Sequence, residues 1–321
     1  MPYKSSILVT GGTTGLGYCA AVEIARQKPD AVVIIASRSS ADDAAAKINK
    51  ALNQSNVQYL PLDLSVLANV HEFASKFLAA SYPPLSALVL NAGIAYPGTV
   101  EYTEDGLEKT FAVNHLAHAL LFYLLRPHLC STARIVITSS NAHDPAMKTG
   151  MPDALYLDAS EAARPTERTL KQPGRKRYTT SKLCNVMWMY ALSRHVETTG
   201  LKYTVTALDP GMMPGTALAR TASPTERFIW NRVLPHIIPV LRRTLNPNIH
   251  KPEESGAALA RLAVGKDVEG ITAKYFEGRK ELQSSEQSYD VSKQDNLWKW
   301  TATAVAKDEF QAKSWEELCD M

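Results

Sequence analysis

Short apolar runs rich in β-branched residues alternate with longer amphipathic stretches along most of this chain. The runs typical of strands are 6–10, 31–36, 57–62, 86–90, 134–138, 202–208 and 273–276. Stretches with helical spacing cover 18–27, 66–80, 104–128, 177–199, 253–264 and 290–306. Such an alternation is typical of a parallel sheet with helices on both faces. The pattern therefore predicts an α/β fold, a doubly wound parallel sheet of about seven strands, in one domain that spans residues 1–321.

Two segments depart from this rhythm. Residues 141–177 are polar and rich in proline and glycine, which predicts an insertion with little regular structure, either covering the site or lying on the surface. Residues 212–243 contain a densely apolar stretch at 224–243, where Pro235 and Pro239 should kink or break any helix. This second segment can be a lid over an apolar substrate, a face that rests on a membrane or another subunit, or a core helix.

In a sheet of this kind, ligands bind beyond the C-terminal ends of the strands. The first strand leads directly into the glycine-rich stretch 11–17 and then into a helix. Glycines permit a tight turn there and let a pyrophosphate approach the amides at the helix N-terminus. The residues expected at this turn are Gly11, Thr13, Thr14, Gly15, Leu16 and Gly17. An ordinary strand-to-helix turn is the alternative.

The end of the second strand distinguishes between the two nicotinamide cofactors. A site for NAD usually places an acidic residue there to accept the ribose 2′-hydroxyl. This chain instead has Ser37 and Arg38, and a guanidinium matches a 2′-phosphate in charge and geometry. The sequence therefore predicts NADP(H), with a solvated loop arginine as the alternative. After the third strand come Asp63 and Leu64, where the carboxylate can accept a hydrogen bond from an adenine amino group.

Tyr178 and Lys182 are four residues apart in the expected helix 177–199, so both side chains fall on one helix face. A phenol has a pKa of about 10, and a nearby ammonium group lowers that pKa by favouring the phenolate. Such a pair can transfer a proton to or from a carbonyl oxygen. A tyrosine and a lysine at this spacing also occur by chance in many helices, so the surrounding motifs decide between the two interpretations.

The composition narrows the classes of function. The chain has 321 residues, 45% of them hydrophobic, and a formal net charge of +3, which is too small to suggest a nucleic-acid partner. The four cysteines are far apart and form no metal-ligand pattern, so we expect neither a metal site nor a disulfide framework. The first strand begins by Ser6, leaving no room for a signal peptide. No apolar run approaches the roughly 20 residues of a membrane span, and we expect a cytoplasmic protein.

The order and rough spacing of several motifs resemble those of the short-chain dehydrogenase/reductase family. These motifs are Thr10-Gly11-x-x-x-Gly15-x-Gly17, Asn91-Ala92-Gly93, Asn114, Ser140, Tyr178-x-x-x-Lys182 and Pro210-Gly211. The resemblance covers roughly residues 5–216, and it is nearest to the retinol-dehydrogenase-like and protochlorophyllide-reductase-like branch. It implies a Rossmann-type fold that binds a nicotinamide dinucleotide.

The resemblance also implies a role for each matching residue. Ser140, rather than its neighbour Ser139, would bind the substrate carbonyl, and Tyr178 would transfer the proton. Lys182 would bind the nicotinamide ribose and lower the phenol pKa, while Asn114 would hold a water in a proton relay. The further cofactor contacts that the family implies are Asn91, Ala92, Gly93, Pro210, Gly211 and Thr216, with Thr216 at the nicotinamide carboxamide.

The chain departs from the family pattern in two places. Positions 140 and 178 leave 37 residues between them, many more than in the simplest members. Extra residues also separate Pro210-Gly211 from Thr216, which weakens the role assigned to that threonine. The 141–177 insertion contains no cysteine, which argues against the light-driven chemistry of protochlorophyllide reductases. By its position in the family, the segment 212–243 would be the substrate lid.

The expected function is NADP(H)-dependent oxidoreduction between an apolar ketone or aldehyde and its alcohol. One alternative is a regulatory protein that senses NADP(H) and has lost catalysis, although such proteins usually lose the tyrosine or the lysine that this chain retains. Another is a sugar-nucleotide epimerase, whose branch favours a Gly-x-x-Gly-x-x-Gly motif instead. The expected partners are a small apolar substrate and no nucleic acid. Contact with a membrane surface and homo-oligomerisation both stay open.

Overall fold

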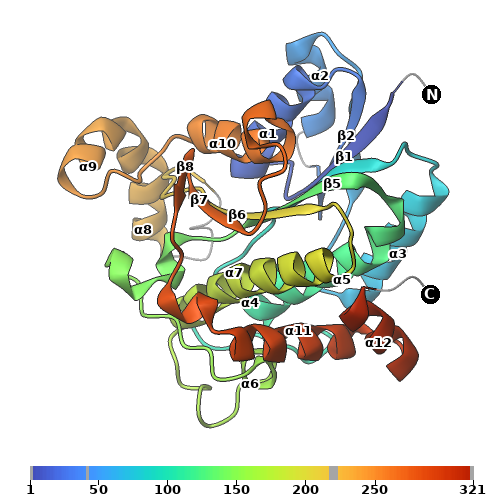
Figure 1. The fold of residues 1–321 in the computed structure, drawn as a ribbon. Helices are drawn as coiled ribbons and strands as arrows, with labels where there is room; N and C mark the ends of the chain where they lie inside the picture. Colours follow the sequence, from blue (N-terminus) through green and yellow to red (C-terminus); the bar gives the residue numbers. More distant parts are fainter. Residues whose placement is uncertain (1–2, 41–42, 217–222, 319–321) are drawn as a thin grey trace.

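The computed structural model describes residues 3–40, 43–216 and 223–318. Within them, eight strands form one sheet (Figure 1). The strands are β1 (Ser5–Thr10), β2 (Ala31–Ser37), β3 (Val57–Pro61), β4 (Leu85–Leu90), β5 (Leu129–Thr138), β6 (Thr204–Asp209), β7 (Lys274–Glu277) and β8 (Lys280–Leu282). They are ordered β3-β2-β1-β4-β5-β6-β7-β8, and all neighbours are parallel except β7 and β8. The predicted doubly wound parallel sheet is confirmed, with one strand more than expected.

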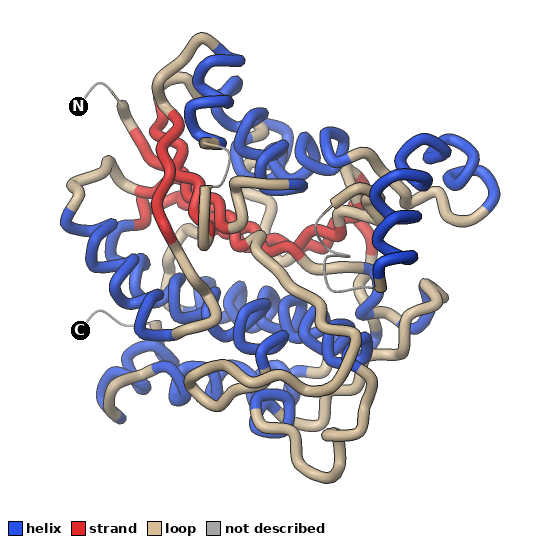
Figure 2. The backbone as a smooth tube through the Cα atoms, turned by 180° about the vertical axis from the view of Figure 1, so that it is seen from behind, coloured by secondary structure: helices blue, strands red, loops and turns tan. Residues whose placement is uncertain are grey.

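Helices cover both faces of this sheet (Figures 1 and 2). They are α1 (Gly15–Gln27), α2 (Ala44–Leu52), α3 (Leu67–Ala79), α4 (Lys109–Phe111), α5 (Ala117–Leu125), α6 (Ala159–Ala163), α7 (Gly174–Thr198), α8 (Pro224–Phe228), α9 (Ile238–Thr244), α10 (Pro252–Val264), α11 (Val291–Val305) and α12 (Glu309–Glu317). On one face, α1 packs against α10 and α2. On the other face, α3, α5 and α7 lie against the strands, with α11 and α12 outside them.

Alternate side chains of the central strands enter two hydrophobic cores, one on each face of the sheet. Ile7 and Val9 of β1 belong to the core shared with α1 and α10, whereas Leu8 belongs to the core shared with α5 and α7. A strand that is covered on both faces is an unbroken apolar run rather than an alternating one. This explains why the central strands could be recognised from the sequence.

The strand order indicates where a ligand is expected to bind. β1 pairs with β4, although β2 and β3 lie between them in the sequence. The chain leaves β1 toward α1 on one face and leaves β4 toward α5 on the other. Loops that diverge in this way open a crevice beyond the C-terminal ends of the strands, where doubly wound folds bind ligands.

The expected helix 104–128 differs most from the observed chain path. Regular helix begins only at Lys109, widens into a π turn at Ala112–Leu116, and ends in a 3₁₀ turn at Arg126–His128. A π turn holds one extra residue per turn and is often found at functional sites. The apolar side chains run evenly through this stretch, so the sequence pattern does not indicate the widened turn, which contains Asn114.

The insertion expected at 141–177 contains little regular structure, as predicted. It holds two 3₁₀ turns, Asn141–His143 and Pro145–Met147, and the five-residue helix α6. The prediction was wrong at the end of the segment, because α7 already begins at Gly174.

Neither β8 nor α12 was expected from the sequence. β8 has three residues and returns from β7 through a turn at Gly278, whose φ is +56°. So short a strand carries no recognisable alternation. The nine residues of α12 begin after Asp308, whose carboxylate accepts the backbone N–H of Gln311.

The segment expected at 212–243 is broken at its prolines, as predicted. It contains α8, a π turn at Ile229–Val233, a 3₁₀ turn at Leu234–Ile237, and α9. The core-helix interpretation is wrong, because the side chains of Phe228 and Val240 are 63% and 58% exposed. Residues 217–222 of this segment lie outside the described residues.

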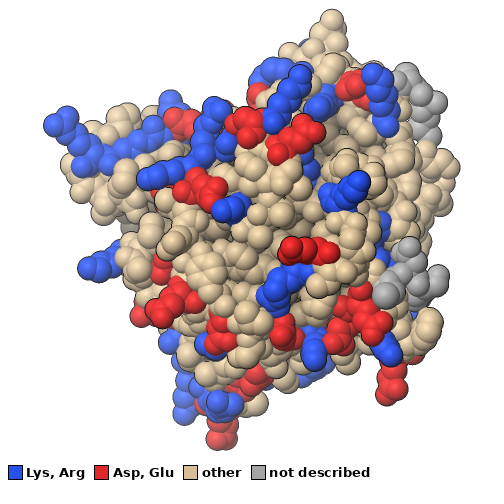
Figure 3. All heavy atoms as spheres, viewed as in Figure 1, with Lys and Arg blue, Asp and Glu red and all other residues tan. Residues whose placement is uncertain are grey.

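Charged side chains of both signs are interspersed over much of the face shown in Figure 3, in line with the small net charge. Within the described residues, no helix is both long and apolar enough to cross a bilayer.

Candidate active site

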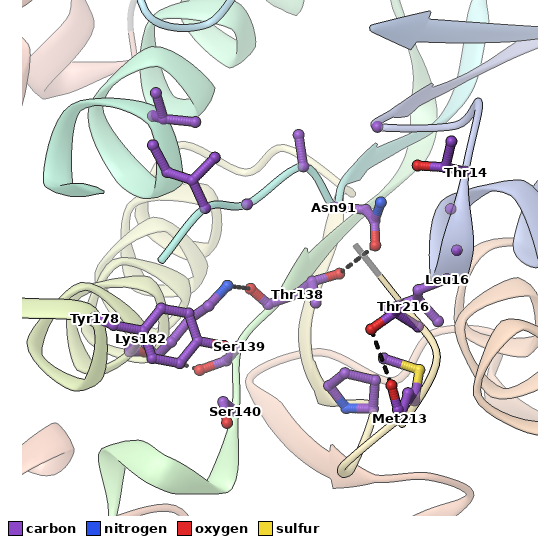
Figure 4. Close-up of a pocket in the computed structure, with 18 of the residues that line it drawn as sticks. Thr14, Leu16, Asn91, Thr138, Ser139, Ser140, Tyr178, Lys182, Met213 and Thr216 are labelled. Carbon is purple, nitrogen blue, oxygen red and sulfur yellow. Dashed lines mark hydrogen bonds between the residues drawn. The ribbon is translucent and has the colours of Figure 1, made fainter. Parts of the chain in front are cut away.

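A cavity of about 740 Å³ opens beyond the C-terminal ends of the strands (Figure 4). All but one of the residues predicted for the site line this cavity; the exception is Asn114. Those that line it are Gly11, Thr13, Thr14, Gly15, Leu16, Gly17, Ser37, Arg38, Asp63, Leu64, Asn91, Ala92, Gly93, Ser140, Tyr178, Lys182, Pro210, Gly211 and Thr216. The fold thus brings together residues that are up to about 200 positions apart in the chain.

In the turn between β1 and α1, the backbone segments lie very close together. A Cβ atom on Gly17 would lie 2.3 Å from the carbonyl oxygen of Gly11, so no larger residue fits there. Thr14 precedes the first turn of α1 but makes no side-chain capping bond to it, and that turn contains no acidic residue. The first amides of α1 are therefore open to a bound anion, and the helix dipole favours negative charge at this end.

Ser37, Arg38 and Asp63, the residues expected to hold the adenosine part of a cofactor, line the same cavity. Arg38 is exposed and has no ion-pair partner among the described residues. Ser37 and Thr13 hydrogen-bond through their hydroxyls at 2.8 Å, which ties the end of β2 to the glycine turn. One oxygen of Asp63 accepts from the backbone and the hydroxyl of Ser65, at 2.9 and 2.7 Å. This fixes the orientation of the carboxylate at the cavity wall.

Asn91 joins the two diverging loops. Its side-chain amide donates to the carbonyl of Thr10 at 2.8 Å, and its backbone N–H donates to the Thr10 hydroxyl at 2.9 Å. The backbone N–H of Ala92 donates to the same hydroxyl at 3.0 Å. The segment 91–93 is thereby held against the end of β1, and Figure 4 shows the Asn91 side chain between the glycine turn and β5.

Tyr178, Lys182 and Ser140 lie together at the other end (Figure 4). The ammonium of Lys182 donates to the carbonyl of Thr138 at 3.1 Å and lies 5.6 Å from the centroid of the Tyr178 ring. The Ser140 hydroxyl hydrogen-bonds the phenol of Tyr178 and accepts the backbone N–H of Ala142 at 3.2 Å. By contrast, the Ser139 hydroxyl donates to the carbonyl of Lys182 at 2.8 Å, so it is occupied in fastening β5 to α7.

Burial governs the titration of this cluster. Burial lowers the pKa of Lys182 to about 8, although the Asp209 carboxylate acts to raise it. Burial raises the pKa of Tyr178 above its usual value, and Asp209 raises it further, whereas the bond with Ser140 lowers it. The expected lowering of the phenol pKa is therefore not the outcome in the protein alone, because desolvation outweighs the other effects. A phenol with a raised pKa keeps its proton at neutral pH, as a proton donor must.

Asn114 does not line the cavity but is bonded to segments next to Tyr178 and Lys182. Its side-chain oxygen accepts the backbone N–H of Ile94 at 2.8 Å. Its amide group donates to the carbonyl of Ile94 at 3.0 Å and to the hydroxyl of Ser181 at 2.9 Å. Both amide hydrogens are thus used in joining the π turn to α7 and to the loop after β4. A water held by Asn114 would have to bond to the remaining lone pair of that oxygen or to the backbone.

Asp209 is a functional candidate that sequence reasoning missed. This carboxylate is 1% exposed and lies directly before Pro210 at the end of β6. It accepts the backbone N–H of Gly211 at 3.1 Å and the side-chain amide of Asn248 at 2.6 Å. Burial raises its pKa, while these bonds and Lys182 lower it. An acidic residue between an apolar strand and a Pro-Gly pair was the available signal; the contact with Asn248 gave none.

His143 was also missed. Burial lowers its pKa, so the ring is neutral. Its Nδ1 bonds the carbonyl of Ser140, and its Nε2 lies 3.1 Å from the backbone N–H of Ser285. The Ser285 N–H must donate to Nε2, so the hydrogen sits on Nδ1 and is donated to Ser140. The insertion after β5 is anchored in this way close to the candidate catalytic serine.

Residues of the candidate lid, together with Leu245 just after it, line one part of the cavity. Met212, Met213, Trp230 and Leu245 line the cavity. Thr216 donates its hydroxyl to the carbonyl of Met213 at 2.9 Å, and its own carbonyl accepts the indole N–H of Trp230 at 3.0 Å. The Thr216 hydroxyl is therefore already engaged within the loop. The described residues hold no cluster of side chains suited to a metal ion.

Comparison with known proteins gives a family profile over the N-terminal half and relatives over most of the chain. The profile of the short chain dehydrogenase family matches residues 5–152. Polyprenol dehydrogenase of Danio rerio is 32% identical over 311 residues, which cover 93% of this chain and 86% of that protein. Retinol dehydrogenase 13 of Homo sapiens is 30% identical over 303 residues, covering 94% and 84%. The crystal structure of the angucycline C-6 ketoreductase LanV with bound NADP matches with a TM-score of 0.61 at 20% identity, covering 86% of this chain and 95% of that one.

Proposed function

This chain belongs to the short-chain dehydrogenase/reductase family of oxidoreductases, and from that premise we propose that it interconverts a carbonyl compound and its alcohol with NADP(H). The observation that carries the proposal is the arrangement of Tyr178, Ser140 and Lys182 in a cavity that Arg38, without an ion-pair partner among the described residues, also lines. The Tyr178 phenol and the Ser140 hydroxyl, which bond each other in the protein alone, can both donate to one carbonyl oxygen bound beside them. Bound NADPH supplies the hydride.

In the reducing direction, Tyr178 donates its proton to the carbonyl oxygen as negative charge develops on that atom. Ser140 accepts from the Ala142 amide and hydrogen-bonds the Tyr178 phenol in the protein alone, and a carbonyl oxygen bound beside the phenol would receive the Ser140 proton in its place. Lys182 gives one N–H to Thr138 and has two more for the ribose hydroxyls of the cofactor. Its positive charge stabilises the phenolate that proton transfer leaves behind.

The residues around the cavity suit NADP(H). The open amides at the start of α1 and the small Gly17 suit a pyrophosphate. Arg38, free of ion pairs among the described residues, suits a 2′-phosphate, and none of the residues 38–41 directly after β2 carries a carboxylate to accept a 2′-hydroxyl. Asp63 suits the adenine amino group.

The substrate end favours an apolar compound. The lid residues Met212, Met213 and Trp230 that line the cavity are all apolar, and Leu245 and Met151 from outside the lid join them. The names of two relatives denote dehydrogenases of polyprenol and retinol, both apolar alcohols. A lid over such a substrate excludes water and strengthens the interactions at the carbonyl.

The test is a panel of ketones, aldehydes and alcohols, assayed with NADPH, NADH and their oxidised forms by absorbance at 340 nm. We expect turnover of bulky apolar carbonyl compounds with NADPH. Tight NADPH binding without turnover of any substrate would favour the regulatory alternative, which the intact cluster of Ser140, Tyr178 and Lys182 speaks against.

A further inference from the structure

Exposed apolar side chains are concentrated on the outer side of the candidate lid. Six of the fourteen large hydrophobic residues that are exposed in the described part of the chain fall within residues 228–245. They are Phe228, Ile229, Val233, Ile237, Val240 and Leu245, with exposed fractions of 63, 43, 40, 39, 58 and 69%. Single exposed apolar residues are normal on a protein surface, but six within eighteen positions indicate an interaction site. We call residues 223–245 the apolar arm.

The apolar arm has an inner and an outer side. Trp230 is only partly exposed, lines the cavity and bonds the loop at Thr216. Phe228 and Val240 do not line the cavity and are more than half exposed. Figure 1 shows α8 and α9 projecting beyond the edge of the sheet. Phe228 and Val240 therefore take no part in the cavity wall.

Positive charge accompanies these apolar side chains. Arg227, Arg232 and Arg243 are exposed and have no ion-pair partner among the described residues. Glu226 is the one acidic residue of the apolar arm, and it pairs with Arg175 at 3.5 Å. In Figure 3, basic side chains gather over the projection that α9 forms in Figure 1. Apolar residues with unneutralised arginines on one short helical segment are typical of peptides that lie in the headgroup region of a membrane.

The positive charge of the apolar arm distinguishes between two possible partners, a second copy of the chain and a membrane surface. A second copy of the chain, docked by the same surface about a two-fold axis, would bring arginines against arginines with one acidic residue on each side to offset them. An anionic lipid surface complements the arginines and accepts the apolar side chains in its acyl region.

We propose that the apolar arm docks the protein onto anionic membranes and so admits an apolar substrate from the bilayer to the cavity. The route would pass from the exposed side chains of the arm to Leu245, which is both exposed and part of the cavity wall. The delivery of substrate rests on the proposed function, whereas the docking does not.

The docking is tested by flotation of the purified full chain with vesicles of phosphatidylcholine alone and of phosphatidylcholine with phosphatidylserine. We expect flotation with the anionic vesicles and little with the neutral ones. The variant R227Q/R232Q/R243Q should bind anionic vesicles on the order of 100-fold more weakly, at roughly fivefold for each lost charge. F228S/V240S should also lose binding, at unchanged net charge.

The matched control is R164Q/R168Q/K171Q, which removes the same charge from exposed positions in the insertion, away from the apolar arm. It should float like the wild type. Failure of the wild type to float, equal loss in the control, or a dimer that F228S/V240S dissociates would each overturn the docking proposal.

Assays with a water-soluble ketone in the absence of vesicles separate the two proposals. All of these variants should keep kcat/KM within about twofold, because none of the changed residues lines the cavity. A protein that floats but reduces no carbonyl compound refutes the proposed function and leaves the docking intact. An active protein that does not float refutes only the docking.

Discussion

The face of α7 that enters the cavity and the apolar arm differ in how completely their side chains are bonded. On α7, Lys182 is fastened to Thr138, Ser181 to Asn114, and both residues are at most 3% exposed. In the apolar arm, Ile238 is the buried residue among the described ones, and the backbone passes through α, π and 3₁₀ turns within about twenty residues.

This difference matches the two tasks that the regions are proposed to perform. Proton transfer requires atoms held within a few tenths of an ångström, which buried and mutually bonded side chains provide. Admission of a substrate requires a segment that can move, and few buried contacts are typical of such segments. Substitutions on α7 should therefore change the rate of the chemical step, whereas those in the arm should change what binds.

The largest effect is expected from Tyr178→Phe. Turnover should fall by about 10²- to 10⁴-fold because the proton donor is lost, while NADPH affinity stays nearly unchanged. Steady-state kinetics and a fluorescence titration with NADPH measure the two quantities. A rate within tenfold of the wild type would exclude Tyr178 from the mechanism.

The second effect concerns the two serines at the end of β5. Ser140→Ala should lower kcat by about 10²- to 10³-fold, as loss of a donor to a developing oxyanion does. Ser139→Ala is the matched control, and it should chiefly lower thermal stability because its hydroxyl binds the backbone of α7. If the Ser139 variant were the more impaired in kcat, the assignment of the two serines would be reversed.

The third effect is on the choice of cofactor. A charge-assisted contact to a 2′-phosphate corresponds to roughly a 10- to 150-fold preference for NADPH over NADH. Arg38→Ala should remove this preference, and Arg38→Asp should reverse it by adding an acceptor for the 2′-hydroxyl. The dissociation constants of both cofactors provide the measurement. Equal affinity of the wild type for NADH and NADPH would refute the role of Arg38.

A smaller effect should separate the inner from the outer side of the apolar arm. Trp230→Ala removes part of the cavity wall and should raise KM about tenfold for bulky apolar substrates, with little change for small ones. Phe228→Ala is the control for loss of an aromatic residue on the outer side. If Phe228→Ala raises KM as much as Trp230→Ala in a vesicle-free assay, the assignment of Trp230 to the inner side and Phe228 to the outer side is wrong.

The smallest effect is a shift in pH dependence. The Asp209 charge raises the pKa of Lys182, which burial lowers to about 8. In Asp209→Asn, Lys182 should lose its proton at lower pH, and the alkaline limb of kcat/KM for carbonyl reduction should move down by on the order of one pH unit. Glu277→Gln is the control, because Glu277 also bonds Asn248, at 2.9 Å. An equal shift in both variants would mean that the position of the alkaline limb depends on the shared bonding to Asn248 and not on the charge of Asp209.

Much of this site could be predicted from the sequence, because strand ends in a parallel sheet meet at one edge. Once 6–10, 86–90 and 134–138 were recognised as strands, the residues that follow them had to lie near one another. Tyr178 and Lys182 needed only the spacing of a helix.

The remainder depended on contacts that no local pattern encodes. Asn248 reaches Asp209 from 39 positions away, and His143 bonds Ser285 across 142 positions. Periodicity indicated that the segment 212–243 is apolar and interrupted, but could not divide Trp230 from Phe228. That division follows from the irregular turns around the prolines, which rotate successive side chains by amounts that no single helical period describes.

The most direct test of the account is the fate of the transferred hydrogen. The full-length protein is incubated with NADPH carrying two deuterium atoms at C4 and a reducible apolar ketone, and the product is analysed by mass spectrometry. The account predicts an alcohol with one deuterium on the former carbonyl carbon, formed by the wild type and lost at least 100-fold with Tyr178→Phe. An alcohol without deuterium at that carbon, or equal yields from the two proteins, would contradict it.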